Sequence, residues 1–473
     1  MTEKIAVDLD GTLIRSDLLW ESAVRHVLRT PLGWADVLAW TARGPVELKS
    51  RLAERVDLDM SLLPYNAGLL ALLEERRAEG AEIVLATAAS RPYAEAVAAH
   101  LGGFDAVIAT PPEGPNLRSA EKARAVDEHF GGGPWTYAGD SVKDLSVWEG
   151  AAAAIAVDAP RSVRGRLADQ GIPVVDADFP RRSKARAWIS QLRVHQWAKN
   201  LLVFVPLATA QLLADPAALL SAVLAFLAFS LTASSVYIWN DLTDIDADRR
   251  HRSKRHRPIA AGTIPIPHAI VGGTVVGLAG LGLALVVGPW FLVTILAYVV
   301  MTTLYSFWLK RKVIIDVTTL ALLYTWRLVA GCIAIAVVPT IWLLAFAAFF
   351  FFGLALVKRY SELYAVGAKG TARGYERGDA QLVLALGVAS SLIAVLVFVL
   401  YIDSAASDEA YRIPQILWLA VPLLLYWVSR LWLVTIRGEM HDDPLIYAVR
   451  NRVSLATFGL IAIVWIAATV LGG

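Results

Sequence analysis

Long apolar segments dominate the second half of the chain and constrain its fold more than any other feature. A membrane-spanning helix needs about 20 mainly apolar residues. Nine segments approach or meet this length: 199–214, 217–240, 264–287, 289–308, 313–337, 339–358, 381–402, 414–435 and 453–472. The first is short and contains Pro206, so it departs most from an ordinary span. Residues 199–473 are therefore expected to form an all-α polytopic domain of nine transmembrane helices.

Charge divides the chain into an acidic front and a basic rear. Residues 1–190 contain 27 acidic and 22 Lys or Arg side chains, whereas residues 191–473 contain 15 and 22. The basic loops between predicted spans all lie on the side of the front domain, and such loops face the cytoplasm. We expect a multi-pass protein of the inner cell membrane, with a cytoplasmic N-terminal domain and, after nine spans, a C-terminus outside. The lone Cys332 excludes an intrachain disulfide and a cysteine-based metal site.

Short apolar runs alternate with helical patterns over residues 1–178. The runs are KIAVDLD, EIVLAT, DAVIAT, WTYAGD, AAIAVD and IPVVD. This alternation predicts an α/β Rossmann-like domain with a parallel sheet, in which ligands bind beyond the carboxyl ends of the strands. Residues 14–76 interrupt the first crossover with Leu- and Trp-rich helical sequence, which predicts a helical cap.

Polar residues collect at the predicted strand ends. Asp8 and Asp10 follow the first strand within DLDGT, and such a pair can divide the roles of nucleophile and of acid and base. Later strand and helix ends carry a hydroxyl, a cation and two carboxylates: Thr87, Lys122, Asp140 and Asp144. This combination suits phosphoryl transfer assisted by Mg²⁺. The alternative is a cluster of solvated acids.

These motifs, in this order, resemble the haloacid dehalogenase superfamily of phosphatases. The resemblance implies that Asp8 is the nucleophile and that Asp10 is the general acid and base. It implies that Thr87 and Lys122 bind phosphate. It also implies Mg²⁺ ligands at the front domain's carboxylates: Asp8, Asp10, Asp140 and Asp144. A degenerate domain that keeps the motifs without activity is the alternative.

A basic segment, residues 179–198, joins the two halves. The sequence from Arg181 to Asn200 is RRSKARAWISQLRVHQWAKN, in which Trp188 and Trp197 interleave with the basic residues. This pattern indicates an interfacial helix lying on anionic lipid. A solvated linker is the alternative.

An acidic cluster follows the second predicted span in NDLTDIDADRRHRSKRHRP. If the helix continues through it, a rotation of about 100° per residue places Asp241, Asp244 and Asp248 within about 60° of one another. Asp246 then points elsewhere, as a solvated charge. Three carboxylates on one face predict an oxygen-rich Mg²⁺ site that holds a diphosphate.

The NDxxDxxxD pattern resembles the aspartate-rich motif of the UbiA superfamily of intramembrane prenyltransferases, whose nine-helix fold fits the predicted spans. Within it the chain looks most like decaprenyl-phosphate phosphoribosyltransferases, through QWAKN, YSFWLKRKVIIDV, RLVAG, KRYSEL and DPLIYAVRNR. An aromatic prenyltransferase would carry a second aspartate-rich motif after the sixth span. Here the loop KGTARGYERGDAQL has Asp379 alone.

Further polar residues of the rear domain are candidates for substrate binding. Those that lie at predicted span ends or in the acidic segment are Lys199, Asn240, Arg257, Lys310, Lys358 and Arg359. For the cations, marking the cytoplasmic side is the alternative role. Asp316 and Arg327 share one helical face, with Arg327 about three turns deeper. A charge at that depth usually faces a cavity, so Arg327 is expected to bind or position a phosphate. The alternative is a structural pair with a carboxylate or helix carbonyls.

Together the two resemblances imply a bifunctional membrane enzyme. The rear domain would transfer 5-phosphoribose from phosphoribosyl diphosphate to a polyprenyl phosphate, and the front domain would remove the 5-phosphate of the product. The alternatives are an aromatic prenyltransferase with a regulatory or separate soluble domain, and a lipid carrier. The expected partners are these substrates and the bilayer, without nucleic acid, while prenyl length, the phosphatase substrate and a homo-oligomer are left open.

Overall fold

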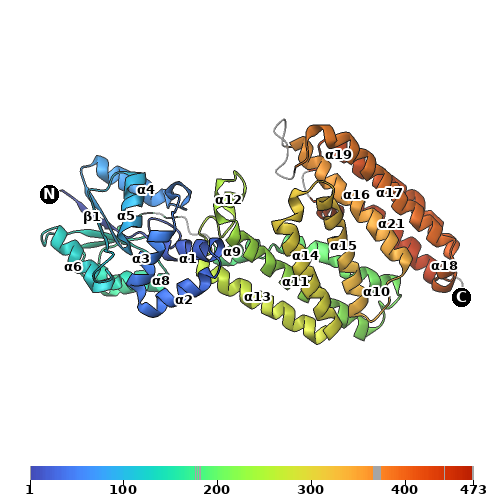
Figure 1. Cartoon of the computed structure of the whole chain (residues 1–473), viewed down its shortest axis with the longest axis horizontal. Helices are drawn as coiled ribbons and strands as arrows, with labels where there is room; N and C mark the ends of the chain where they lie inside the picture. The colour runs from blue at the N-terminus through green and yellow to red at the C-terminus, as the bar shows by residue number, and fades with distance from the viewer. Residues whose placement is uncertain are drawn as a thin grey trace. The chain divides into compact units, whose positions relative to one another are not determined.

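The computed structural model describes residues 2–470 except 176, 178, 180–182, 366–373 and 441–442. It divides into two compact units (Figure 1). Unit 1 contains Met1–Leu192 and Tyr237–Gly273, and unit 2 contains Arg193–Val236 and Thr274–Gly473. The acidic segment after the second predicted span therefore belongs to the same unit as the N-terminal domain.

A five-stranded parallel sheet forms the centre of unit 1, which confirms the predicted α/β domain. Its strands are β1 (Lys4–Val7), β2 (Glu82–Ser90), β3 (Ala106–Thr110), β4 (Thr136–Gly139) and β5 (Ala153–Ala156), in the order β3-β2-β1-β4-β5. In the sixth apolar run, whose described residues are 172–175, Val174 forms an isolated bridge with Ala154. Because β1 is central and pairs with β2 and β4, the residues after these three strands meet at one edge.

Helices cover both faces of this sheet. The first crossover holds α1 (Leu18–Arg29), α2 (Gly33–Arg43), α3 (Pro45–Arg55), η1 (Met60–Leu62) and α4 (Ala67–Ala78), where the cap is expected. The later helices are α5 (Arg91–Leu101), α6 (Ser119–His129), η2 (Val142–Asp144), α7 (Leu145–Trp148), α8 (Arg161–Asp169) and α9 (Lys184–Gln191). Alternate residues of β1 enter opposite cores, since Ile5 and Val7 pack with α1–α3 and Ala6 packs with α6–α8.

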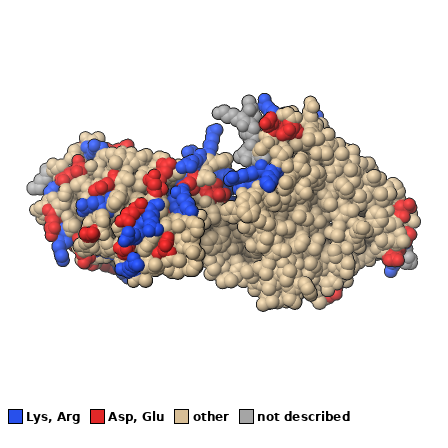
Figure 2. Space-filling model, in the orientation of Figure 1, with Lys and Arg blue, Asp and Glu red and all other residues tan. Residues whose placement is uncertain are grey.

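Among the described residues, eight helices are long and apolar enough to cross a membrane, so the chain is a multi-pass membrane protein. They are α11 (Pro216–Thr243), α13 (Ile266–Val287), α14 (Pro289–Phe307), α15 (Ile315–Ala334), α16 (Ile341–Ala365), α17 (Ala380–Ile402), α19 (Ala420–Ile436) and α21 (Arg452–Val470). Each matches a predicted span. On the face seen in Figure 2, the helical domain shows few charged side chains, whereas both signs are spread over the α/β domain. Exposed apolar side chains such as Val271, Leu278 and Trp290 are the groups that lipid would cover.

The first predicted span, 199–214, is not a single helix. It is divided between η3 (Val194–Phe204) and α10 (Val205–Thr209), and Pro206 lies in the first turn of α10. An external C-terminus requires an odd number of crossings, so that expectation depends on this segment and stays a prediction. The predicted linker and the loop with Asp379 lie partly outside the described residues, at 180–182 and 366–373.

Candidate active sites

The turn after β1 sets up a polar site in unit 1. Gly11 adopts φ +85°, a conformation that favours glycine, and a Cβ added there would lie 2.8 Å from Asp140 Oδ2. The Gly11 amide donates to the Ser16 carbonyl oxygen at 3.0 Å. The turn therefore brings Asp8 and Asp10 beside Asp140, at the ends of the neighbouring strands β1 and β4.

Lys122 is held at the centre of this site. Its Nζ donates to Asp8 Oδ1 at 2.7 Å and to the Tyr137 hydroxyl at 2.7 Å, and lies 3.7 Å from Asp144 Oδ1. Burial alone would lower the pKa of Lys122, but the charges of Asp8 and Asp144 outweigh it and raise that pKa. Lys122 is thus a buried cation at the predicted nucleophile. Sequence reasoning did not find Tyr137, which was hidden within a strand.

Asp10 occupies a different environment from Asp8. Its Oδ1 accepts from the Leu18 amide at 2.8 Å, at the start of the cap. Burial, followed by the charge of Asp17, raises the pKa of Asp10. Burial also raises the pKa of Asp8 to about 6, although Lys122 opposes it, and raises that of Asp140 to about 7. Because a raised pKa favours the protonated form of Asp10, this side chain suits the role of general acid.

Three carboxylates of the site can hold a metal ion. One oxygen from each of Asp8, Asp140 and Asp144 lies within 4.8 Å of the others. Asp144 Oδ2 also accepts from the amides of Asp140 and Ser141, at 3.2 and 3.1 Å, which fixes its orientation. An all-oxygen donor set of this kind fits Mg²⁺. Asp10, which was also expected as a ligand, lies outside this group.

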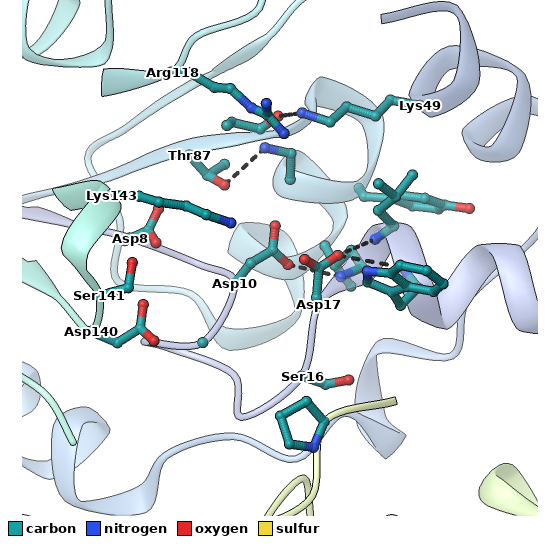
Figure 3. Close-up of a pocket in the computed structure, with 18 of the residues that line it drawn as sticks. Asp8, Asp10, Ser16, Asp17, Lys49, Thr87, Arg118, Asp140, Ser141 and Lys143 are labelled. Carbon is teal, nitrogen blue, oxygen red and sulfur yellow. Dashed lines mark hydrogen bonds between the residues drawn. The ribbon is translucent and has the colours of Figure 1, made fainter. Parts of the chain in front are cut away.

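The site opens into a cavity of about 540 Å³ within unit 1. Thr87 lines it, almost fully buried, with its hydroxyl accepting from the Ala89 amide at 3.0 Å. Four cations that sequence reasoning missed also line it: Arg15, Lys49, Arg118 and Lys143. Figure 3 labels the last three. Pro265, Ile266 and Pro267, before and at the start of α13, form part of the wall. A single Lys or Arg on a helix or loop has no sequence pattern that predicts that it lines a cavity.

The acidic segment continues the helical path of α11 with one irregular residue. α11 ends at Thr243 and α12 spans Ile245–Arg250, while the Asp248 amide still donates to the Asp244 carbonyl oxygen at 2.8 Å. Arg257 Nη1 donates to Asp241 Oδ1 at 2.9 Å and to Asp248 Oδ2 at 2.7 Å. The predicted common face therefore brings Asp241 and Asp248 together.

The two other expected residues of this segment differ in exposure. Asp244 is exposed and Asn240 is half-buried. Gln191 Nε2 donates to Asp241 Oδ2 at 2.9 Å. Because one guanidinium lies between Asp241 and Asp248, Arg257 supplies the positive charge that a divalent cation would supply there. The carboxylates fit a cation, while the guanidinium of Arg257, expected to bind substrate, is engaged by them.

The prediction that Asp246 is a solvated charge is wrong. Its carboxylate forms ion pairs with Arg25, through both guanidinium Nε and Nη2, and with Arg29 at 3.3 Å. The neighbouring Arg249 pairs with Glu21 at 2.7 and 3.1 Å. The segment after α11 is thus joined to α1 within unit 1 by two charged contacts, which helical periodicity alone could not reveal.

Unit 2 holds a separate cluster of charges around Asp443. Lys199 Nζ lies 2.7 Å and Lys358 Nζ 3.3 Å from Asp443 Oδ2, and the Tyr324 hydroxyl donates to the same oxygen at 3.2 Å. Two expected cations therefore share one carboxylate, which sequence reasoning missed although Asp443 directly precedes the Pro444 that begins α20 (Pro444–Arg450). Lys310 lies half-buried in η5 (Leu309–Arg311).

Three further expected residues of unit 2 are buried. Arg359 is fully buried and forms an ion pair with Asp316 at 2.6 Å, so neither side chain is exposed to a substrate. Arg327 donates to Asn200 Oδ1 at 2.9 Å and to the Leu323 carbonyl oxygen at 2.5 Å. Arg327 thus has the helix-carbonyl contact considered as its structural alternative, and Arg359 has a carboxylate partner rather than an open site.

An apolar cavity of about 480 Å³ also lies within unit 2. Aromatic and aliphatic side chains dominate its lining, among them Leu201, Phe346, Phe350, Phe398, Trp427 and Trp465. Leu202 and Leu445, close in sequence to the Lys199 and Asp443 pair, line it as well. Such a lining suits a hydrocarbon chain.

Comparisons with known proteins agree with this division. The model of the UbiA prenyltransferase family matches residues 202–451, and that of haloacid dehalogenase-like hydrolases matches residues 5–149. The chain belongs to the UbiA prenyltransferase family and carries a haloacid dehalogenase-like hydrolase domain at its front. It is an enzyme of the transferase class joined to a hydrolase domain. Over its UbiA part it is homologous to decaprenyl-phosphate phosphoribosyltransferase.

Three similar proteins represent these matches. The uncharacterized protein y4nM of Sinorhizobium fredii is 36% identical over 96% of this chain and 89% of its own length. Decaprenyl-phosphate phosphoribosyltransferase of Mycobacterium tuberculosis is 32% identical over 59% of this chain and 91% of its own length. A UbiA homologue from Archaeoglobus fulgidus, solved with GPP and Mg²⁺, is 21% identical over 60% of this chain and 97% of that chain, with a TM-score of 0.45.

Proposed function

We propose that the chain is a bifunctional enzyme. Its membrane domain transfers 5-phosphoribose from phosphoribosyl diphosphate to a polyprenyl phosphate, and its front domain then hydrolyses the 5-phosphate of the lipid-linked product. The observation that carries the transferase assignment is the 32% identity over 91% of a named phosphoribosyltransferase. The phosphatase assignment rests on the contact between Lys122 and Asp8 beside two further carboxylates.

In the transfer step, a phosphate oxygen of the polyprenyl phosphate attacks the anomeric carbon. The bond from that carbon to the diphosphate breaks, and the diphosphate leaves with the electron pair. Asp241, Asp244 and Asp248 would hold Mg²⁺, which neutralises charge on the diphosphate when bound. Within unit 2, Lys199 and Lys358 carry positive charge that suits a phosphate group. The apolar cavity of unit 2 suits the prenyl tail.

In the hydrolysis step, an Asp8 oxygen attacks phosphorus, the bond from phosphorus to the sugar oxygen breaks, and an aspartyl phosphate forms. Water then attacks this phosphorus and releases inorganic phosphate from Asp8. Asp10, whose pKa is raised by burial, gives its proton to the departing sugar oxygen and then takes a proton from the attacking water. Lys122 balances the phosphate charge while it contacts Asp8. Asp8, Asp140 and Asp144 would hold Mg²⁺, which withdraws charge from the phosphate oxygens when bound.

Transfer of a prenyl group to an aromatic acceptor is the second candidate. It would need additional metal-binding carboxylates after the sixth predicted span. Asp379 is engaged there in the first turn of η7 (Arg377–Asp379), because its Oδ2 accepts from the Glu376 amide at 2.9 Å. This contact favours a capping role for Asp379 over a ligand role.

The test supplies purified full-length protein in detergent with phosphoribosyl diphosphate, a polyprenyl phosphate and Mg²⁺. Wild type should form a lipid-linked ribose without a 5-phosphate, and Asp8→Asn should accumulate the phosphorylated lipid. Asp241→Asn should form neither, whereas the exposed Asp408→Asn should match wild type. No glycosylated lipid from wild type would refute the transferase. The same product from Asp8→Asn and wild type would refute the coupling.

A further inference from the structure

Five Lys or Arg and five Asp side chains line the cavity at Asp8, so Lys122 is one of several cations there. Lys122 is already engaged by Asp8 and Asp144. Lys49 and Arg118 line the same cavity from the cap and from the residue before α6 (Figure 3). In the described part of the chain, neither of these two forms an ion pair with a carboxylate.

Lys49 is a buried cation held by neutral groups. Only 8% of the residue is exposed, and its Nζ donates to the Ala88 carbonyl oxygen at 2.5 Å and to Asn116 Oδ1 at 2.9 Å. Burial, and then the charge of Arg118, lower the pKa of Lys49, and the charges of Asp10 and Asp17 offset only part of this. A buried cation that no carboxylate contacts is costly, and a bound anion would reduce that cost.

Arg118 brings a second positive charge to the same place. Its side chain and that of Lys49 reach toward one another in the cavity (Figure 3). Two adjacent cations repel each other unless an anion lies between them. The planar guanidinium of arginine and a lysine ammonium are the usual protein ligands of phosphate oxygens.

Lys49 and Arg118 lie in the same cavity as the predicted nucleophile Asp8. The Ala88 carbonyl oxygen that binds Lys49 belongs to the residue directly after Thr87, which is itself a predicted phosphate ligand at the end of β2. A cavity of about 540 Å³ is large enough for a small sugar with two phosphate groups, since ligand pockets span roughly 300–1,000 Å³.

We propose that Lys49 and Arg118 form a second anion subsite, which binds a phosphate group at the opposite end of the substrate from the phosphomonoester attacked by Asp8. The substrate class is therefore a sugar phosphomonoester with a second phosphate. This proposal rests on the proposed phosphatase function and deepens it. The lipid-linked product of the transferase has this chemistry, with a 5-phosphomonoester and a phosphodiester at carbon 1.

The test compares two soluble substrates with full-length enzyme: ribose 5-phosphate, and ribose 1,5-bisphosphate, which adds only the second phosphate. Loss of the 5-phosphate is followed by ³¹P NMR. Wild type should prefer the bisphosphate by about tenfold in kcat/KM, as one or two charge-assisted contacts allow. Arg118→Gln and Lys49→Gln should reduce this ratio toward one. Arg124→Gln, an exposed change on α6 outside the cavity, should keep it.

The outcomes separate the two proposals. Equal efficiency of wild type on both compounds, or an equal loss on both in Arg118→Gln, overturns the subsite and leaves the phosphatase assignment standing. No hydrolysis that depends on Asp8 with either compound overturns both. A second arm compares phosphoribosyl diphosphate with the lipid-linked phosphoribose. The lipid should be the better substrate, and a preference for the free diphosphate would overturn the lipid assignment.

Discussion

Glu21 and Arg249 form a buried ion pair, 228 residues apart in the chain, with nitrogen–oxygen distances of 2.7 and 3.1 Å. Glu21 lies on α1 of the predicted cap, and Arg249 follows the acidic residue Asp248 on α12. Arg25 also donates to the Glu21 carboxylate, at 2.6 Å. This contact joins the hydrolase domain to the segment that carries the transferase motif, within one compact unit.

Removal of the Glu21 charge should destabilise unit 1. Glu21→Gln leaves Arg249 and Arg25 buried without their shared carboxylate, and loss of one partner of a buried pair costs about 3–5 kcal/mol. Thermal unfolding in detergent should show a lower Tm for this variant. Glu74→Gln, an exposed change on α4, should alter stability by less than about 0.5 kcal/mol. Equal Tm values for the two variants would contradict the prediction.

The same group predicts a dependence of stability on pH. Burial would raise the pKa of Glu21, but Arg249 and then Arg25 outweigh it and lower the pKa to about 2. A lowered pKa stabilises the fold above the unfolded value of 4.5, and this contribution of about 3 kcal/mol is lost as pH falls from 4.5 toward 2. Urea unfolding from pH 6 to 3 should therefore show a steeper loss for wild type than for Glu21→Gln. Parallel curves would exclude this role of Glu21.

Gly11 should be essential to the hydrolase site. An alanine there would need φ +85° and would place its Cβ against Asp140, so the turn after β1 must move. We expect Gly11→Ala to reduce phosphatase kcat/KM by about tenfold or more, because small displacements of reacting groups are costly. Gly165→Ala is the matched control, since a Cβ there meets no atom within 4 Å. It lies in α8 and should stabilise the domain by up to about 1 kcal/mol while leaving hydrolysis unchanged.

Asp443 should be needed to keep two lysines together in unit 2. Burial alone would raise the pKa of Asp443, but Lys199 and Lys358 outweigh it and hold this pKa well below its usual range. Asp443→Asn leaves the two ammonium groups to repel each other. We expect it to lower Tm and to raise the KM for polyprenyl phosphate, both measured beside Asp408→Asn. Wild-type values of both quantities would show that the cluster is dispensable.

Local sequence patterns predicted the elements of both domains well. Apolar runs located five parallel strands and eight long helices. A run of apolar residues leaves water, and its backbone groups must then hydrogen-bond within a sheet or a helix. The segment RPYAEAVAAHL, for example, is α5. The strand-end motifs also placed Asp8, Lys122, Asp140 and Asp144 at one site, since parallel strands bring their carboxyl ends to one edge.

Only the tertiary structure decided which charges meet. Asp246, Arg359 and Arg327 each gained buried partners that helical periodicity does not specify, and Lys199 found Asp443 at a separation of 244 residues. The physical reason is the sequence distance over which each interaction acts. Hydrophobic periodicity and turn chemistry act over one element, whereas the partner of a buried charge depends on which surfaces of distant elements pack together.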